Sequence, residues 1–167
     1  DRLVFSSAGF CSFLAAVPEW RDRTVTINGL SKSAAMTGWR VGWTVAPRAL
    51  TQALSTLQGQ ATSGINSVAQ WASLAALNLP ESYFGEQLTV YRRRREIVVK
   101  CFENLTKSRK IEAMAPQGAF YLWIEVGAIL KSTGLSDAGA FAERILEESR
   151  VAVVPGNAFG RSDCLRL

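Results

Sequence analysis

The sequence contains no histidine, only three cysteines and no long apolar run. Without histidine, a serine–histidine triad, an imidazole general base and a histidine-ligated zinc site are all excluded. Cys11, Cys101 and Cys164 are odd in number and far apart, so they predict neither a disulfide framework nor a metal site. Acid–base chemistry therefore has to use lysine, a carboxylate, tyrosine or a cofactor.

The composition is that of a globular chain. It is 48% hydrophobic and 20% charged over 167 residues, which suits one domain or two small ones. No stretch approaches the eighteen or so apolar residues of a membrane span, and the opening D-R-L-V-F is not a leader, so we expect a cytoplasmic protein. The net charge is +5, and 14 of the 19 basic residues are arginine, which suits binding of phosphates and carboxylates as well as nucleic acid.

The most informative stretch covers residues 28–43, N-G-L-S-K-S-A-A-M-T-G-W-R-V-G-W. A strand-like run, Thr24–Ile27, enters it, and an apolar run, Val41–Ala46, leaves it. The glycine and hydroxyl residues between them suit a tight loop. If the chain reverses within this loop, Lys32 and Arg40 face one small anionic group.

Lysine and arginine in this arrangement suit one kind of ligand. A lysine amine that is partly desolvated beside another cation loses its proton more readily, and it can then form a Schiff base. An arginine offers a planar fork that binds phosphate through two parallel hydrogen bonds. An aldehyde cofactor that carries a phosphate needs both groups, and pyridoxal phosphate is such a cofactor.

The stretch S-K-S-A-A-M-T-G-W-R-V-G-W resembles the cofactor-lysine signature of the class I and II aminotransferases, the aspartate aminotransferase-like group of fold-type I pyridoxal-phosphate enzymes. In that family the lysine binds the cofactor covalently, and an arginine eight positions later holds its phosphate. Lys32 and Arg40 match both residue type and spacing. Many relatives carry a hydroxyl three positions before the lysine, where this chain has Gly29, and we take Ser31 as a candidate cofactor-binding residue.

A second resemblance lies near the end of the chain. V-P-G-N-A-F-G followed by L-R-L is similar to the family segment whose arginine binds the α-carboxylate of the substrate, and Arg166 stands at the matching place. P-Q-G-A-F-Y-L-W, residues 116–123, is also similar to a family stretch. It leaves two alternatives for Phe120 and Tyr121, which either approach the substrate or pack in the core. Asn66 either caps a helix or, as in relatives, lies near a dimer interface.

The resemblance implies an α/β fold of the fold-type I class, in a C-terminal fragment. Residues 1–80 would be the C-terminal part of the large, mostly parallel-sheet domain, residues 81–106 a long bridging helix, and residues 107–167 an incomplete small α+β domain. The upstream groups that complete the cofactor site in relatives would be missing. We therefore expect the fragment alone to be inactive and to bind pyridoxal phosphate weakly, and the full-length enzyme to be a homodimer.

Apolar spacing places the expected elements. We expect helices from Pro47, over Val68–Leu77, over residues 81–106, and after Ser136 as N-cap. Beyond the strand before Lys32, we expect strands over residues 109–115, 119–126 and 151–154.

Three functions fit these features. The first is transamination between an amino acid and a 2-oxo acid, with pyridoxal phosphate as cofactor and no metal. The second is a lyase or decarboxylase of the same fold, which the lysine–arginine pair alone does not separate from a transaminase. The third is a nucleic-acid-binding module built on Arg92–Arg95. Successive helical residues point about 100° apart, so this run wraps around its helix, and solvated surface is the favoured interpretation.

Overall fold

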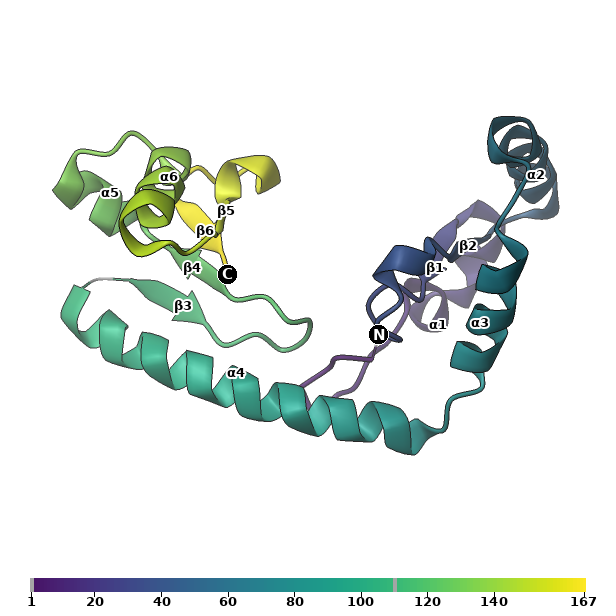
Figure 1. Cartoon of the computed structure of the whole chain (residues 1–167), viewed down its shortest axis with the longest axis horizontal. Coiled ribbons are helices and arrows are strands. Elements are labelled where there is room, and N and C mark those ends of the chain that lie inside the picture. The colour runs from purple at the N-terminus through teal and green to yellow at the C-terminus, as the bar shows by residue number, and fades with distance from the viewer. Residues whose placement is uncertain (1, 110) are drawn as a thin grey trace. The chain divides into compact units, whose positions relative to one another are not determined.

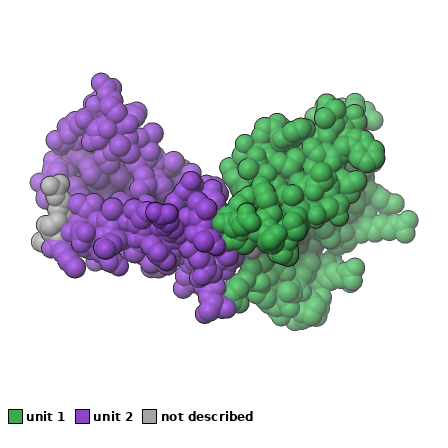
Figure 2. All heavy atoms as spheres, turned by 60° about the horizontal axis from the view of Figure 1, so that its bottom comes forward, with its two compact units in different colours: residues 1–2, 8–87 green, residues 3–7, 88–167 purple. Residues whose placement is uncertain are grey.

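The computed structural model describes residues 2–109 and 111–167, and it forms two compact units (Figures 1 and 2). Unit 1 contains Arg2 and residues 8–87, and unit 2 contains residues 3–7 and 88–167. Each unit has its own cluster of buried hydrophobic side chains. The two are therefore described separately.

Unit 1 is built on an antiparallel hairpin. It runs α1 (Phe13–Ala16), η1 (Pro18–Arg23), β1 (Thr26–Gly29), η2 (Thr37–Trp39), β2 (Gly42–Val45), α2 (Arg48–Thr62) and α3 (Ser67–Leu77). Thr26 lies opposite Val45, and Gly29 lies opposite Gly42, so the expected reversal of the chain is confirmed. The strand begins two residues later than expected, because Thr24 caps η1 and its hydroxyl donates to the Trp20 carbonyl at 2.8 Å.

Helix α3 and the loop that carries Lys32 share the core of unit 1. Its buried members are Leu30, Met36, Val41, Ala69 and Ala76. The Asn66 side chain caps α3, since its Oδ1 accepts hydrogen bonds from the backbone N–H groups of Val68 at 2.8 Å and Ala69 at 3.2 Å. This contact favours the capping alternative for Asn66.

The long helix expected over residues 81–106 is present as α4 (Glu81–Arg109). The boundary between the two units falls within it, between Gln87 and Leu88. Val98 and Phe102 pack against the core of unit 2, as the apolar spacing predicts. None of the helices among the described residues is both long and apolar enough to cross a membrane.

Unit 2 contains a four-stranded antiparallel sheet in the order β3-β4-β6-β5. The strands are β3 (Glu112–Met114), β4 (Trp123–Glu125), β5 (Val154–Pro155) and β6 (Cys164–Arg166), and the other elements are α5 (Gly127–Thr133), α6 (Ala138–Ser149) and η3 (Gly156–Phe159). Its core combines sheet residues such as Ile124 and Leu165 with helix residues such as Leu130 and Ala142. The last strand in sequence, β6, is thus an interior strand with neighbours on both sides.

The strands of unit 2 are shorter than the sequence predicted. Residues 119–122 are not in a strand, because Ala119 has a left-handed backbone (φ 63°) and its N–H donates to the Leu3 carbonyl at 2.9 Å. The strand expected over residues 151–154 begins only at Val154, and the one expected over residues 109–115 is limited to β3 within its described part. Tertiary hydrogen bonding, more than β propensity, decides where these strands begin and end.

The N-cap of α6 is Asp137 and not Ser136 as expected. The Asp137 carboxylate accepts a hydrogen bond from the Ala140 N–H at 3.0 Å. Both residue types are good N-caps, so the sequence predicted the helix correctly and its first residue wrongly by one position.

Candidate active site

The hairpin of unit 1 brings Ser31 and Arg40 to one pocket. The Leu30 N–H donates to the Val41 carbonyl at 3.4 Å, which extends the β1–β2 pairing beyond the two glycines. Ser31 and Arg40 are the next residue on each arm. They line a pocket of about 240 Å³ together with Asn28, Gly29, Val41 and Gly42. Two of the three residues assigned to the cofactor therefore meet at the end of the hairpin.

Arg40 is held in a left-handed backbone conformation, with φ 55° and ψ 47°. This region is uncommon for residues other than glycine, asparagine and aspartate. The Arg40 Nη1 donates to the Thr37 carbonyl at 3.1 Å, across the η2 turn. This is the one side-chain hydrogen bond of Arg40 among the described residues, so the other guanidinium N–H groups are available to an anion.

Gly29 is required by the close approach of the two strands. A Cβ at this position would lie 2.9 Å from the Val41 carbonyl oxygen and 3.3 Å from the Gly42 Cα. The chain therefore has no room at Gly29 for the hydroxyl-bearing side chain that the family resemblance would place there. Ser31, two residues later and in the pocket lining, is the hydroxyl that this hairpin offers instead.

Lys32 lies beside the pocket on the loop that follows β1. Its carbonyl accepts a hydrogen bond from the Ala35 N–H at 3.4 Å, and the buried side chains of Leu30 and Met36 fix the loop at both ends. Lys32 is not among the residues that line the pocket. Its side chain is exposed, so the partly desolvated setting expected from the sequence is not found in this chain.

Arg166 lies in unit 2, on the interior strand β6, opposite Trp123 of β4 and Val154 of β5. Its guanidinium carbon lies 4.5 Å from the centre of the Tyr121 ring and 4.7 Å from that of Phe159. Among the described residues it forms no side-chain hydrogen bond and no ion pair. Its donors are thus free to bind an external carboxylate.

The aromatic residues of the 116–123 stretch are on the surface. Phe120 is 41% exposed and Tyr121 is 37% exposed, and their ring centres lie 4.4 Å apart. The core-packing alternative does not fit this exposure, and Tyr121 contacts Arg166, the arginine expected to bind the substrate carboxylate. Phe159 was not predicted as a site residue, although it lies within the motif P-G-N-A-F-G.

The arginine run of α4 does not form one cationic stripe. The Arg95 Nε donates to the Pro116 carbonyl at 2.7 Å, and the Arg94 guanidinium lies 5.5 Å from the Tyr91 ring centre. Two of the four arginines are thus engaged by the chain itself. The run is thus divided between contacts within the chain and solvated helix surface, and it adds no observation in favour of the nucleic-acid alternative.

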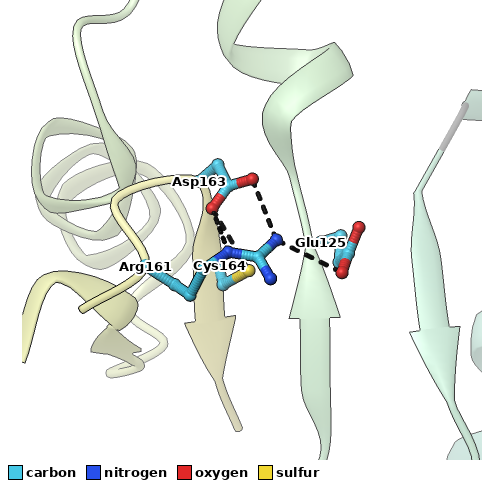
Figure 3. Close-up of polar contacts among 4 residues, drawn as sticks. All are labelled: Glu125, Arg161, Asp163 and Cys164. Atoms are coloured by element: carbon cyan, nitrogen blue, oxygen red, sulfur yellow. Dashed lines mark hydrogen bonds and ion pairs between the residues drawn. The ribbon is translucent and has the colours of Figure 1, made fainter. Parts of the chain in front are cut away.

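A polar cluster beside β6 was not predicted (Figure 3). Arg161 donates to both carboxylate oxygens of Asp163, at 2.8 and 3.0 Å, and to Glu125 at 3.3 Å. These bonds lower the pKa of Asp163 to about 2, whereas burial raises the pKa of the Cys164 thiol. The thiol is therefore protonated at neutral pH and is a poor nucleophile. Glu125 and Arg161 are 36 residues apart, and no local pattern signals their contact.

Comparison with known proteins identifies the family. The sequence profile described as aminotransferase class I and II matches residues 2–167. The chain is 38% identical to an aspartate aminotransferase of Rhizobium meliloti and 37% identical to an aspartate/prephenate aminotransferase of Cereibacter sphaeroides, each over all of this chain and 41% or 42% of the relative. The chain thus spans about two fifths of the length of these relatives.

Solved structures agree with the sequence comparison. The crystal structure of the Rhizobium meliloti aspartate aminotransferase superposes with a TM-score of 0.88 at 36% identity, over 99% of this chain and 42% of that one. The aspartate aminotransferase of Thermotoga maritima gives a TM-score of 0.82 at 40% identity, over all of this chain and 40% of that one. The chain therefore belongs to the class I and II aminotransferase family, and the expected α/β fold is confirmed.

Proposed function

We propose that this member of the aminotransferase family is part of an enzyme that moves an amino group between an amino acid and a 2-oxo acid. The observation that carries the proposal is the pocket shared by Ser31 and Arg40, beside the loop that holds Lys32. The names of the relatives, aspartate and aspartate/prephenate aminotransferase, make an acidic amino acid the first donor to test.

Pyridoxal phosphate is the proposed cofactor, and the pocket fits its phosphate. The unused N–H groups of Arg40 and the Ser31 hydroxyl are donors for phosphate oxygens. When bound, this cofactor supplies an aldehyde and an electron-accepting ring. Lys32 would bind the aldehyde through its Nζ and, once released, move the proton at the Cα of the substrate.

Arg166 is proposed to bind the α-carboxylate of the substrate. All amino-acid and 2-oxo-acid substrates share a planar carboxylate, which the guanidinium fork matches in shape and charge. Its lack of an acidic partner among the described residues supports this role. Fixing the carboxylate would orient the Cα–H bond for proton transfer.

We further infer that residues 1–80 belong to the large domain, 81–106 to a bridging helix and 107–167 to the small domain. The boundary between the two compact units inside α4 supports this division. Family membership supports a homodimer for the full-length enzyme, and the composition supports a cytoplasmic location.

Reductive trapping tests the cofactor site without requiring turnover. The full-length enzyme that contains these residues is incubated with pyridoxal phosphate, reduced with borohydride and mapped by mass spectrometry. We expect Lys32 to be labelled in preference to the other lysines, and Arg40→Ala to abolish this preference. Arg48→Ala removes an exposed arginine outside the pocket and serves as the matched control. Equal labelling of all lysines would refute the assignment.

The same-fold lyase is separated from the transaminase by its products. L-aspartate and a 2-oxo acid are supplied to an active preparation that contains these residues, and both the new amino acid and free ammonia are measured. Transfer to the 2-oxo acid supports the transaminase, whereas ammonia released without an acceptor supports the lyase.

A further inference from the structure

Arg166 lies close to two aromatic rings that come from different segments of unit 2. Its guanidinium carbon lies over the Tyr121 ring at 4.5 Å and over the Phe159 ring at 4.7 Å. We propose that Tyr121 and Phe159 are positioning residues that hold the Arg166 guanidinium ready for a substrate carboxylate. This inference rests on the carboxylate role proposed above for Arg166, and it explains how that side chain is kept in place.

The backbone of Arg166 is fixed by the sheet, but the side chain is not. Strands β4 and β5 flank β6, and next to Arg166 the Leu122 and Leu167 backbones exchange two hydrogen bonds at 2.8 and 2.9 Å. Beyond Cβ, an arginine side chain still has several rotatable bonds and high rotamer entropy. Something other than the sheet therefore has to set the direction of the guanidinium.

The two rings supply that restraint without using the hydrogen-bond donors. Aromatic faces attract a cation through their negative electrostatic potential, most strongly where water is partly excluded. A carboxylate partner would restrain the guanidinium equally well, but it would compete with the substrate for the same N–H groups. Rings over the guanidinium leave its donors available at the edge, where a planar carboxylate binds.

Each ring is itself held by a neighbouring ring. The Phe159 ring meets the Trp123 ring edge-to-face at 5.7 Å and 80°, and the Tyr121 ring lies 4.4 Å from that of Phe120. Trp123 is also the β4 residue directly opposite Arg166 in the sheet. The position of Phe159 is therefore linked to the strand that carries the arginine, and such packed rings lose little entropy when the cation is bound.

The test follows the Arg166 Nε–H group by NMR in the 15N-labelled chain. Its mobility is compared with that of exposed Arg93. L-alanine is then titrated at constant ionic strength, and L-alaninamide, which lacks the carboxylate, is the ligand control. Phe159→Leu and Tyr121→Leu each remove one ring, whereas Phe159→Tyr and Tyr121→Phe retain it.

We expect Arg166 Nε–H to be less mobile than that of Arg93 and to shift with L-alanine only. Each leucine variant should mobilise the group and weaken L-alanine binding about three- to tenfold, while the ring-retaining variants should stay within about twofold of the wild type. Arg166→Lys removes the observed Nε–H group, so its binding of L-alanine is measured by isothermal titration calorimetry, and this binding should be lost because a lysine lacks the fork.

The outcomes separate the two proposals. If L-alanine binds and Arg166→Lys abolishes binding, but the leucine variants bind as tightly as the wild type, the positioning role is overturned and the carboxylate role stands. If L-alanine does not shift the wild-type signal, the carboxylate role fails and the positioning role falls with it. If the leucine variants fail to fold, the mobility of the two Nε–H groups in the wild type decides. An Arg166 Nε–H group as mobile as that of Arg93 overturns the positioning role.

Discussion

Gly29 and Gly42 lie opposite each other where the hairpin of unit 1 closes on its pocket, and a Cβ on Gly29 would lie 2.9 Å from the Val41 carbonyl oxygen. The backbone of a paired strand cannot move away without breaking its hydrogen bonds. The pocket thus depends on a residue that has no side chain.

Gly29→Ala is therefore expected to lower the free energy of unfolding of unit 1 by about 1–3 kcal/mol through overpacking. The matched control is Gly59→Ala in α2, where an added Cβ meets nothing within 4 Å and should stabilise the helix by up to about 1 kcal/mol. Chemical denaturation followed by circular dichroism measures both. Equal stability of the two variants would contradict the steric argument.

Arg40 combines backbone strain with a proposed binding role. A comparison of Arg40→Gly with Arg40→Ala should separate the effect of the strain on stability from the effect of the lost guanidinium on binding. At φ 55° a glycine is unstrained and an alanine is not. Arg40→Gly is expected to be more stable than Arg40→Ala by about 1 kcal/mol. Both variants should lose the selective labelling of Lys32 by pyridoxal phosphate and borohydride. A glycine variant less stable than the alanine variant would show that the left-handed conformation is not a source of strain.

The ion pair between Arg161 and Asp163 predicts a specific dependence of stability on pH. The pKa of Asp163 falls from an ordinary value of about 3.8 to about 2 in the folded chain. As the pH falls, the Asp163 carboxylate is therefore protonated in the unfolded chain before it is protonated in the folded chain. The stabilisation is fully present above about pH 4 and is lost as the pH falls towards 2.

Asp163→Asn should therefore flatten the decline of the melting temperature between pH 4 and pH 2. Asp22→Asn, at an exposed site in unit 1, is the control and should leave that decline unchanged. Thermal melts at half-unit pH steps provide the measurement. If the melting temperature of the wild type does not change between pH 4 and pH 2, the ion pair does not stabilise unit 2.

Local features of the sequence were sufficient to predict the hairpin and the helices α2, α3, α4 and α6, but not the short helix α5. The hydroxyl and glycine residues around Lys32 predicted the reversal of the chain, and apolar spacing predicted the start of α2 and both ends of α4 to within a few residues. The same spacing did not predict burial, since Leu50 and Leu57 of α2 are 40% and 67% exposed in this chain. Periodicity identifies which side chains share a face, and it does not show what covers that face.

The contacts of the Arg166 side chain could not be predicted from the sequence, for a different reason. The motif predicted the arginine itself, but its contacts with Tyr121 and Phe159 depend on how strands far apart in the sequence pair in the sheet. The contact of Glu125 with Arg161 has the same origin. Such pairings follow from tertiary packing and not from local propensity.

Gly156 links the second motif to the position of Arg166. A Cβ on Gly156 would meet the Arg161 carbonyl oxygen, and it would lie 2.7 Å from that of Cys164. Gly156 therefore allows η3, which ends with Phe159, to lie against β6. Gly156→Ala should separate the two elements and lower the free energy of unfolding of unit 2 by about 3 kcal/mol, the upper end for overpacking.

The same variant should also release Arg166 from Phe159, because the ring and the arginine lie on the two elements that are forced apart. NMR of the Arg166 Nε–H group would detect this as a loss of the ring-current shift, and denaturation would give the stability. Gly127→Ala is the control, since its Cβ would make only an ordinary contact of 3.6 Å with Asp163. If Gly156→Ala keeps both the stability and the ring-current shift of the wild type, the glycine of this motif does not position the arginine.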